Sequence, residues 1–319
     1  LMVTGVQTCA LPIWKGFHQP NYSSESAKIK EFLVNFKDDE GNPKYSILID
    51  QIPNQSLKDL QIELDDVFKF SNDLGNNILN NTDRYLKLFY KAVDTILPEP
   101  APDFGSSSDY INAARLAAMK EADSENKIPK ELLRHHTIRF IPPTKQQTVP
   151  MRNIRASNIG SLIRVKGLVT RITQVKPLIN VASYTCSQCS EETFQVINSP
   201  SFLPRTVCQS QQCKSSPRPG QLTLQTRGSK FIKFQMIRLQ ELSNEVPPGH
   251  IPRTLTVYVR EHLTQKCQTG DVIELDGIFL PMPIRGSKQS LVNETYIEAQ
   301  NIRVAAKCDE IDEGDEEEI

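Results

Sequence analysis

Four cysteines constrain this chain more than any other feature, because they form two close pairs within 28 residues. The sequence reads Cys186-Ser-Gln-Cys189, then 18 residues, then Cys208-Gln-Ser-Gln-Gln-Cys213. Each short turn places two thiolates on one edge of a tetrahedron, and the intervening segment can fold one pair onto the other. This spacing predicts a bound Zn²⁺ ion with four ligands, namely Cys186, Cys189, Cys208 and Cys213.

Such a site is expected to be structural, since four thiolates leave zinc no open position for water. The alternatives are buried thiols without a metal, a redox dithiol, and iron, which the wide second spacing leaves open. The chain has seven cysteines, an odd number, and no credible signal peptide. We therefore expect a reducing compartment and metal binding rather than a disulfide framework.

The first 20 residues are interpreted as a sequence artefact. The stretch VTGVQTCALPI resembles the translation of a sequencing adapter. A signal peptide is the alternative, but the stretch lacks a basic start and Pro12 interrupts it. No run in the chain is long or apolar enough to predict a membrane span.

Residues 21–140 are predicted to form a helical subdomain. Helical spacing places Ile29, Phe32, Leu33 and Phe36 on one face. Residues 82–97 predict a second helix that Thr82 caps and Pro98 ends, with a stripe of Tyr85, Leu88, Phe89, Val93 and Ile96. Between them, Ile62 and Leu64 alternate as in a strand. Residues 98–127 predict a loop and then a further helix.

Residues 141–307 are predicted to form an OB-type β-barrel. From about residue 135, short β-branched segments alternate with turn residues, beginning with IRFIPP and including LTLQT and FIKFQMIRLQ as two separate strands. The cysteines lie within this region, so a zinc ribbon at 184–216 is expected as an insertion. Residues 308–319 form an acidic tail, which we interpret as a truncated linker. The predicted fold class is thus α+β and multidomain.

The charge of the predicted barrel is strongly positive. Residues 151–307 hold 20 Lys and Arg against 10 Asp and Glu, whereas residues 309–318 hold eight acids and no base. A basic β-domain favours an anionic partner, and nucleic acid is the first candidate; an acidic protein is the alternative. Basic residues alternate with apolar ones along two strands, as expected for a single-strand-binding groove or an ordinary solvated face. These residues are Arg164, Lys166, Arg171, Lys230, Lys233 and Arg238.

Several segments occur in an order that resembles the amino-terminal region of the minichromosome maintenance (MCM) family. They are SNIGSLIRVKGLVTRITQVKP, the two cysteine pairs, RGSKFIKFQ, LQELSNEVPPGHIPR, TGDVIELDGIFLP and ETYIEAQNI. The C-x4-C pair, VPPGHIPR and GIFLPMPIRG are most similar to the subunit-seven branch. The resemblance implies a six-subunit ring that acts as the replicative DNA helicase.

The resemblance also implies roles for particular residues. Residues 240–253 resemble the family's allosteric loop, carried here by Gln240, Glu241, Pro247, Gly249, Pro252 and Arg253. Arg285 and Lys288 flank a Gly-Ser turn like the family's DNA-binding hairpin, and Arg171 and Lys176 lie where family barrels contact single strands. With Lys230 and Lys233, these four form the expected DNA-binding set. Expected partners are other MCM subunits in a heterohexamer, single- and double-stranded DNA and replication initiation factors, in the nucleus, without a membrane.

No G-x-x-x-x-G-K-[ST] motif occurs in the chain, so no phosphate-cradling loop is predicted. ATP and Mg²⁺ are expected only through a missing carboxy-terminal module, and no catalytic site is assigned. The alternative function is a stand-alone zinc-ribbon OB protein that binds single-stranded DNA. A metalloenzyme is not favoured, because the cysteine set is closed and the five histidines (His18, His135, His136, His250 and His262) are scattered.

Overall fold

The computed structural model describes residues 22–38, 41–53, 57–97, 115, 128–197, 202–210, 213, 220–282 and 294–306. Residues 1–20, the acidic tail and almost all of 98–127 therefore lie outside the described residues, as do Pro98 and the predictions made for these segments. Within the described part of the chain, no helix combines the length and apolarity needed to cross a membrane.

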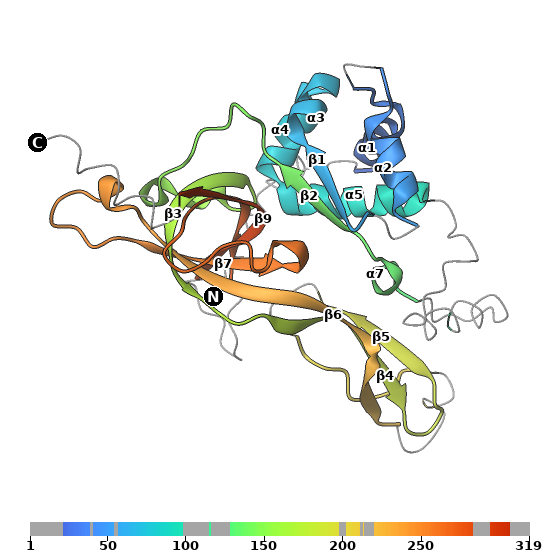
Figure 1. Ribbon diagram of the computed structural model, residues 1–319. Helices are drawn as coiled ribbons and strands as arrows, with labels where there is room; N and C mark the ends of the chain where they lie inside the picture. Colours follow the sequence, from blue (N-terminus) through green and yellow to red (C-terminus); the bar gives the residue numbers. More distant parts are fainter. Residues whose placement is uncertain are drawn as a thin grey trace, which may run out of the picture.

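The amino-terminal region is mainly helical, as predicted (Figure 1). Its helices are α1 (Tyr22–Asn35), α2 (Lys44–Gln51), α3 (Leu64–Phe70), α4 (Asn72–Asn80), α5 (Thr82–Ile96) and the short α7 (Lys130–Leu133). On α1, the residues at helical spacing are buried: Ile29, Phe32 and Leu33 are fully covered. They pack with Tyr85 and Phe89 of α5 into one apolar core.

Two local predictions in this region are wrong. Thr82 does not cap α5, because Asn81 occupies the cap position and Thr82 begins the helix; its hydroxyl donates to the carbonyl of Ile78 at 2.8 Å. Ile62 and Leu64 were predicted to alternate within one strand, but only Ile62 lies in a strand. Ile62 is buried in β1 (Asp59–Glu63), whereas Leu64 begins α3.

The strand at IRFI is not part of the barrel, contrary to expectation. It forms β2 (Thr137–Ile141), which pairs in parallel with β1 as a separate two-stranded sheet. Arg139 of β2 forms an ion pair with Asp59 and also donates from Nη1 to the carbonyl of Gln300 at 3.2 Å. That second contact links the small sheet to the barrel.

The barrel has five strands, and the predicted OB-type fold is confirmed. They are β3 (Leu162–Ile172), β6 (Leu222–Gln240), β7 (Thr254–Arg260), β8 (Val272–Pro281) and β9 (Thr295–Ala306). Their order is β3-β8-β9-β7-β6, and pairing of β6 with β3 closes the sheet. Alternate residues fill the interior; Val165, Ile237 and Val257 are almost fully buried. Short 3-10 turns lie at Met151–Asn153, Ala156–Asn158, Ser243–Glu245 and Glu261–Leu263.

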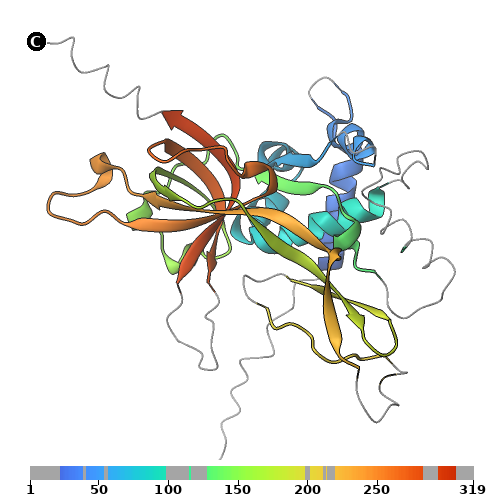
Figure 2. The same cartoon turned by 60° about the horizontal axis from the view of Figure 1, so that its bottom comes forward.

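An arm projects from the barrel and carries the four cysteines (Figures 1 and 2). It consists of β4 (Lys176–Cys186), β5 (Glu192–Val196) and the first half of β6. The segments LTLQT and FIKFQMIRLQ, expected as two strands, form one strand of 19 residues. They merge because β4 pairs with β6 along almost its whole length, from Lys176 opposite Phe234 to Cys186 opposite Leu222.

A buried ion pair lies between two barrel strands. Arg164 of β3 donates from Nε to Asp276 of β8 at 2.7 Å, and the two side chains are 9% and 2% exposed. Asn301 of β9 donates to the other carboxylate oxygen at 3.1 Å. Arg164, expected on a basic surface, is thus a structural residue that joins three strands.

We expect Arg164→Ala to destabilise the fold by about 3–5 kcal/mol, because it leaves the Asp276 carboxylate buried without its partner. Chemical denaturation measures this change in the free energy of unfolding. Lys166→Ala is the matched control on the same strand, with an expected cost below about 1 kcal/mol. Equal losses in the two variants would contradict the assigned role of the pair.

Candidate metal centre and nucleic-acid surface

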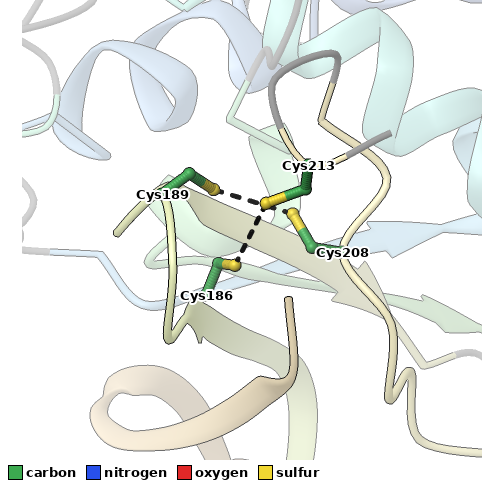
Figure 3. A group of neighbouring side chains, drawn as sticks. All are labelled: Cys186, Cys189, Cys208 and Cys213. Carbon is green, nitrogen blue, oxygen red and sulfur yellow. Dashed lines mark hydrogen bonds between the residues drawn. The ribbon is translucent and has the colours of Figure 1, made fainter. Parts of the chain in front are cut away.

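The four cysteines meet at the end of the arm (Figure 3). Cys186 ends β4, Cys189 lies in the following turn, and Cys208 and Cys213 approach from the loop that precedes β6. Their sulfurs lie within 4.8 Å of one another; the Cys186–Cys213 and Cys189–Cys208 separations are 3.7 and 3.8 Å. A tetrahedron with a metal–sulfur length of about 2.3 Å has edges of about 3.8 Å. The cluster therefore has the dimensions of a four-thiolate metal site.

Hydrogen bonds favour the thiolate at Cys186 and Cys189, whereas at Cys213 the lowering effect of Ser210 is outweighed by burial and the neighbouring cysteines, which raise its pKa to about 11. The backbone N–H of Gln188 lies 3.4 Å from the sulfur of Cys186. The Ser210 hydroxyl lies 3.5 Å from Cys189 and 3.3 Å from Cys208, and its hydrogen bond lowers the pKa of Cys189 to about 6. Gly220 allows the close packing, since a Cβ there would meet the Cys186 sulfur at 2.3 Å.

Arg115 fastens the arm, and sequence reasoning missed it. Its guanidinium donates to Glu192 at 2.9 Å, to the carbonyl of Gly228 at 3.1 Å and to the Ser183 hydroxyl at 3.3 Å. It also lies over the ring of Phe194, 5.3 Å from the centroid. One side chain thus joins β4, β5 and β6. In the sequence it is an arginine in a helical pattern, which carries no signal of this contact.

Part of the predicted basic surface is assembled on one face of the barrel. Arg171 of β3 lies opposite Arg238 of β6, and both are exposed. Lys176 lies opposite Phe234, which shares its β6 face with Arg238 because the two are four residues apart. These three cations, Arg171, Lys176 and Arg238, are called the barrel basic face below.

The other predicted DNA-binding residues lie elsewhere. Lys233 is exposed, but it lies on the other face of β6. At Ile237, four residues further along, that face points into the barrel. Lys230 donates to the backbone carbonyls of Glu131 and Arg134, so its ammonium holds the arm against α7. Arg285 and Lys288 lie outside the described residues.

The loop from Gln240 to Arg253 projects from the barrel between β6 and β7 (Figure 2). Gln240 pairs with Thr254 at its base. The buried Glu241 carboxylate accepts from Arg152 at 2.8 Å and from the Arg253 N–H at 3.2 Å. Beyond this base, Pro247, Gly249 and Pro252 shape the turn, with Gly249 at φ +79°. The loop thus has a rigid base and an exposed tip.

Two family models match the chain in sequence order. The MCM N-terminal domain matches residues 26–142, and the MCM OB domain matches residues 150–283. The second match covers most of the closed barrel and the whole arm.

Curated relatives extend this similarity over most of the chain. DNA replication licensing factor MCM7 of Arabidopsis thaliana is 38% identical over 88% of this chain, and that of Xenopus tropicalis is 39% identical over 93%. The minichromosome maintenance protein MCM of Saccharolobus solfataricus is 29% identical over 91%. The chain spans 41%, 44% and 39% of the lengths of these relatives.

We expect Arg115→Ala to loosen the arm, because three strands lose a shared hydrogen-bond donor. The local cost is about 1–3 kcal/mol, typical of a lost charged hydrogen bond. Hydrogen exchange at the amides of β5 measures it, and those amides should exchange faster. The exposed Arg205, on the same arm, gives the control Arg205→Ala. Unchanged exchange in β5 would show that Arg115 contributes nothing to the arm.

Proposed function

Because this chain belongs to the MCM family, we propose that it acts as the amino-terminal, DNA-binding and ring-forming part of a subunit-seven-type protein. The observation that carries this proposal is the closed OB barrel whose longest strand continues into the four-cysteine arm, within the matched MCM domains. The stand-alone single-strand-binding alternative is not favoured, because MCM relatives match 88–93% of the chain.

The proposed partners follow from the names of those relatives. Because these relatives are named DNA replication licensing factors, the chain is proposed to take part in a multi-subunit MCM ring on DNA in the nucleus. Other MCM subunits and replication initiation factors are its proposed neighbours. The loop from Gln240 to Arg253 is proposed to relay contacts to an adjoining part of that ring. Its rigid base and exposed tip support this role. No ATP or Mg²⁺ site is proposed within residues 22–306.

The barrel basic face is proposed to bind DNA phosphates. Arg171 and Arg238 are side by side, and Lys176 continues the same face, so a backbone could follow all three. Such contacts position nucleic acid without reading its sequence. The hairpin residues Arg285 and Lys288 are proposed to extend the path, as the family resemblance implies. Lys230 and Lys233 have weaker support, since the first is bound to carbonyls and the second lies on the opposite face.

The four-cysteine cluster is proposed to hold one structural Zn²⁺ ion. Cys186, Cys189, Cys208 and Cys213 would complete its coordination, leaving no site for water. The ion would therefore have a structural role and no catalytic one. It would fix the tip of the arm, which is otherwise held by short strands and loops.

For the metal, we expect one zinc per chain by elemental analysis. Cys189→Ser should lower zinc affinity and increase amide exchange in residues 186–196, because the arm loses its cross-link. Cys267→Ser is the control, since Cys267 is buried in the barrel away from the cluster. A folded arm without any bound metal would contradict the proposal, and iron in place of zinc would correct the identity.

For DNA, we expect Arg171→Ala combined with Arg238→Ala to weaken binding to single-stranded DNA. Two lost phosphate contacts should lower the log–log salt slope by about 1.4, with little dependence on base sequence. Fluorescence anisotropy at several salt concentrations measures both quantities. Thermal stability should stay nearly constant, since both side chains are exposed.

Two single variants control for charge and for position. Lys30→Ala removes an exposed cation from α1, and Lys233→Ala removes one from the other face of β6. Neither should change the salt slope. If the double variant binds as the parent does, the barrel basic face is not the DNA site. If Lys233→Ala alone weakens binding, the DNA follows the opposite face.

A further inference from the structure

The two halves of the four-cysteine cluster are built differently, and the difference concerns Ser210. In the first pair, backbone groups form the turn. The Ser190 N–H donates to the Cys186 carbonyl at 3.1 Å, and the Gln188 N–H donates to the Cys186 sulfur at 3.4 Å. In the second pair, two more residues separate the cysteines, and a side-chain hydroxyl, that of Ser210, contacts the sulfurs.

Backbone pairing fixes the approach to the second pair. Val207 forms an isolated β-bridge with Gln221, and the Cys208 N–H donates to the carbonyl of Gly220 at 3.0 Å. Gly220 permits this approach, since a Cβ there would lie 3.2 Å from the Cys213 sulfur. Cys208 is thus held by its backbone, and the chain then spans four residues to reach Cys213.

The Ser210 hydroxyl connects the two ends of that span. Its oxygen accepts from the Cys213 N–H at 3.3 Å, which is the local bond that Ser side chains make at turns and helix starts. The same oxygen lies 3.3 Å from the sulfur of Cys208 and 3.5 Å from that of Cys189. One hydroxyl therefore contacts three of the four cysteines.

A metal-loaded cluster needs hydrogen-bond donors around its sulfurs. Four thiolates around one divalent ion leave a net charge of about −2. Cys186, Cys208 and Cys213 are each only 4% exposed, so water screens little of that charge. Buried charge is costly unless hydrogen bonds offset it. A metal-bound thiolate has no proton to give, so the Ser210 hydroxyl must be the donor in its contact with Cys208 or Cys189.

We propose that Ser210 is a positioning residue of the metal centre, which closes the wider cysteine pair and donates a hydrogen bond to a metal-bound thiolate. The two contacts have different effects. Accepting from the Cys213 N–H fixes the direction from which that cysteine approaches, whereas donating to sulfur stabilises a charged ligand. This inference deepens the proposed metal centre and rests on it, and it assigns a role to a residue that is not itself a ligand.

Metal titration of the full chain tests the proposal. Zn²⁺ affinity is measured under reducing conditions by competition with a colorimetric chelator. We expect Ser210→Ala to lower the affinity about tenfold or more, as is typical when a residue that orients metal ligands is lost. Ser210→Thr keeps the hydroxyl and should restore most of the affinity. Ser187→Ala is the matched control, because Ser187 lies between the cysteines of the first pair with an exposed side chain, and it should leave the affinity unchanged.

Cobalt spectroscopy separates the two contacts of the hydroxyl. Co²⁺ in a four-thiolate site has a sulfur-to-metal charge-transfer band, and a hydrogen bond to sulfur lowers the energy of the sulfur electrons. We therefore expect Ser210→Ala to shift this band to longer wavelength and Ser187→Ala to leave it in place. A loss of affinity with the band at its parental wavelength would show that Ser210 only closes the turn, and would overturn its donation to sulfur.

The outcomes also separate the role of Ser210 from the metal centre itself. A parent chain that binds neither Zn²⁺ nor Co²⁺ would overturn both. If the parent binds metal and Ser210→Ala binds it as tightly, the metal centre stands and the role of Ser210 is wrong. Equal weakening in Ser210→Ala and Ser210→Thr would show that the hydroxyl is not the group that acts, and would likewise overturn the inference.

Discussion

One strand, β6, serves two structures at once, and the rest of the molecule depends on it. Its carboxyl-terminal half closes the barrel against β3 and pairs with β7, while its amino-terminal half pairs with β4 to form the arm. Because β6 is one strand of 19 residues, whose pairing is interrupted only at residues 226–229, its backbone connects the barrel to the arm directly. The orientation of the four-cysteine cluster relative to the barrel is therefore set by strand geometry and by two irregularities, one in β4 between Ile179 and Val181 and one in β6 between Gln225 and Lys230.

Buried charges at the edges of this β-structure define the positions of loops and neighbouring elements. Glu241 holds the base of the loop that follows β6, Arg115 holds β5 to β6, and Lys230 holds β6 to the end of α7. Each contact joins residues far apart in sequence. Each contact favours one arrangement of the chain, since a buried charge without its partner is costly. The surfaces proposed to meet DNA and other subunits are presented by this rigid framework.

The contact between the amino-terminal region and the barrel is polar as well as apolar. Arg139 reaches from β2 to the backbone of β9, where its Nη1 donates to the carbonyl of Gln300 at 3.2 Å. Leu162 and Ile278 of the barrel join the core of the helices. The two regions are thus joined by a shared apolar core and by the Arg139 hydrogen bond.

The sequence by itself determined the local elements and the four-cysteine cluster. The apolar spacing of α1 and α5, the alternation of the barrel strands and the cysteine spacing each depend on neighbours within a few residues, so they could be predicted. The tertiary structure alone decided which strands pair and where each charge lies. It placed the strand at IRFI beside β1, merged two expected strands into β6, buried Arg164 against Asp276 and separated Lys233 from Arg171. These outcomes depend on partners 36 or more residues away, whose contacts leave no periodic signal in the sequence.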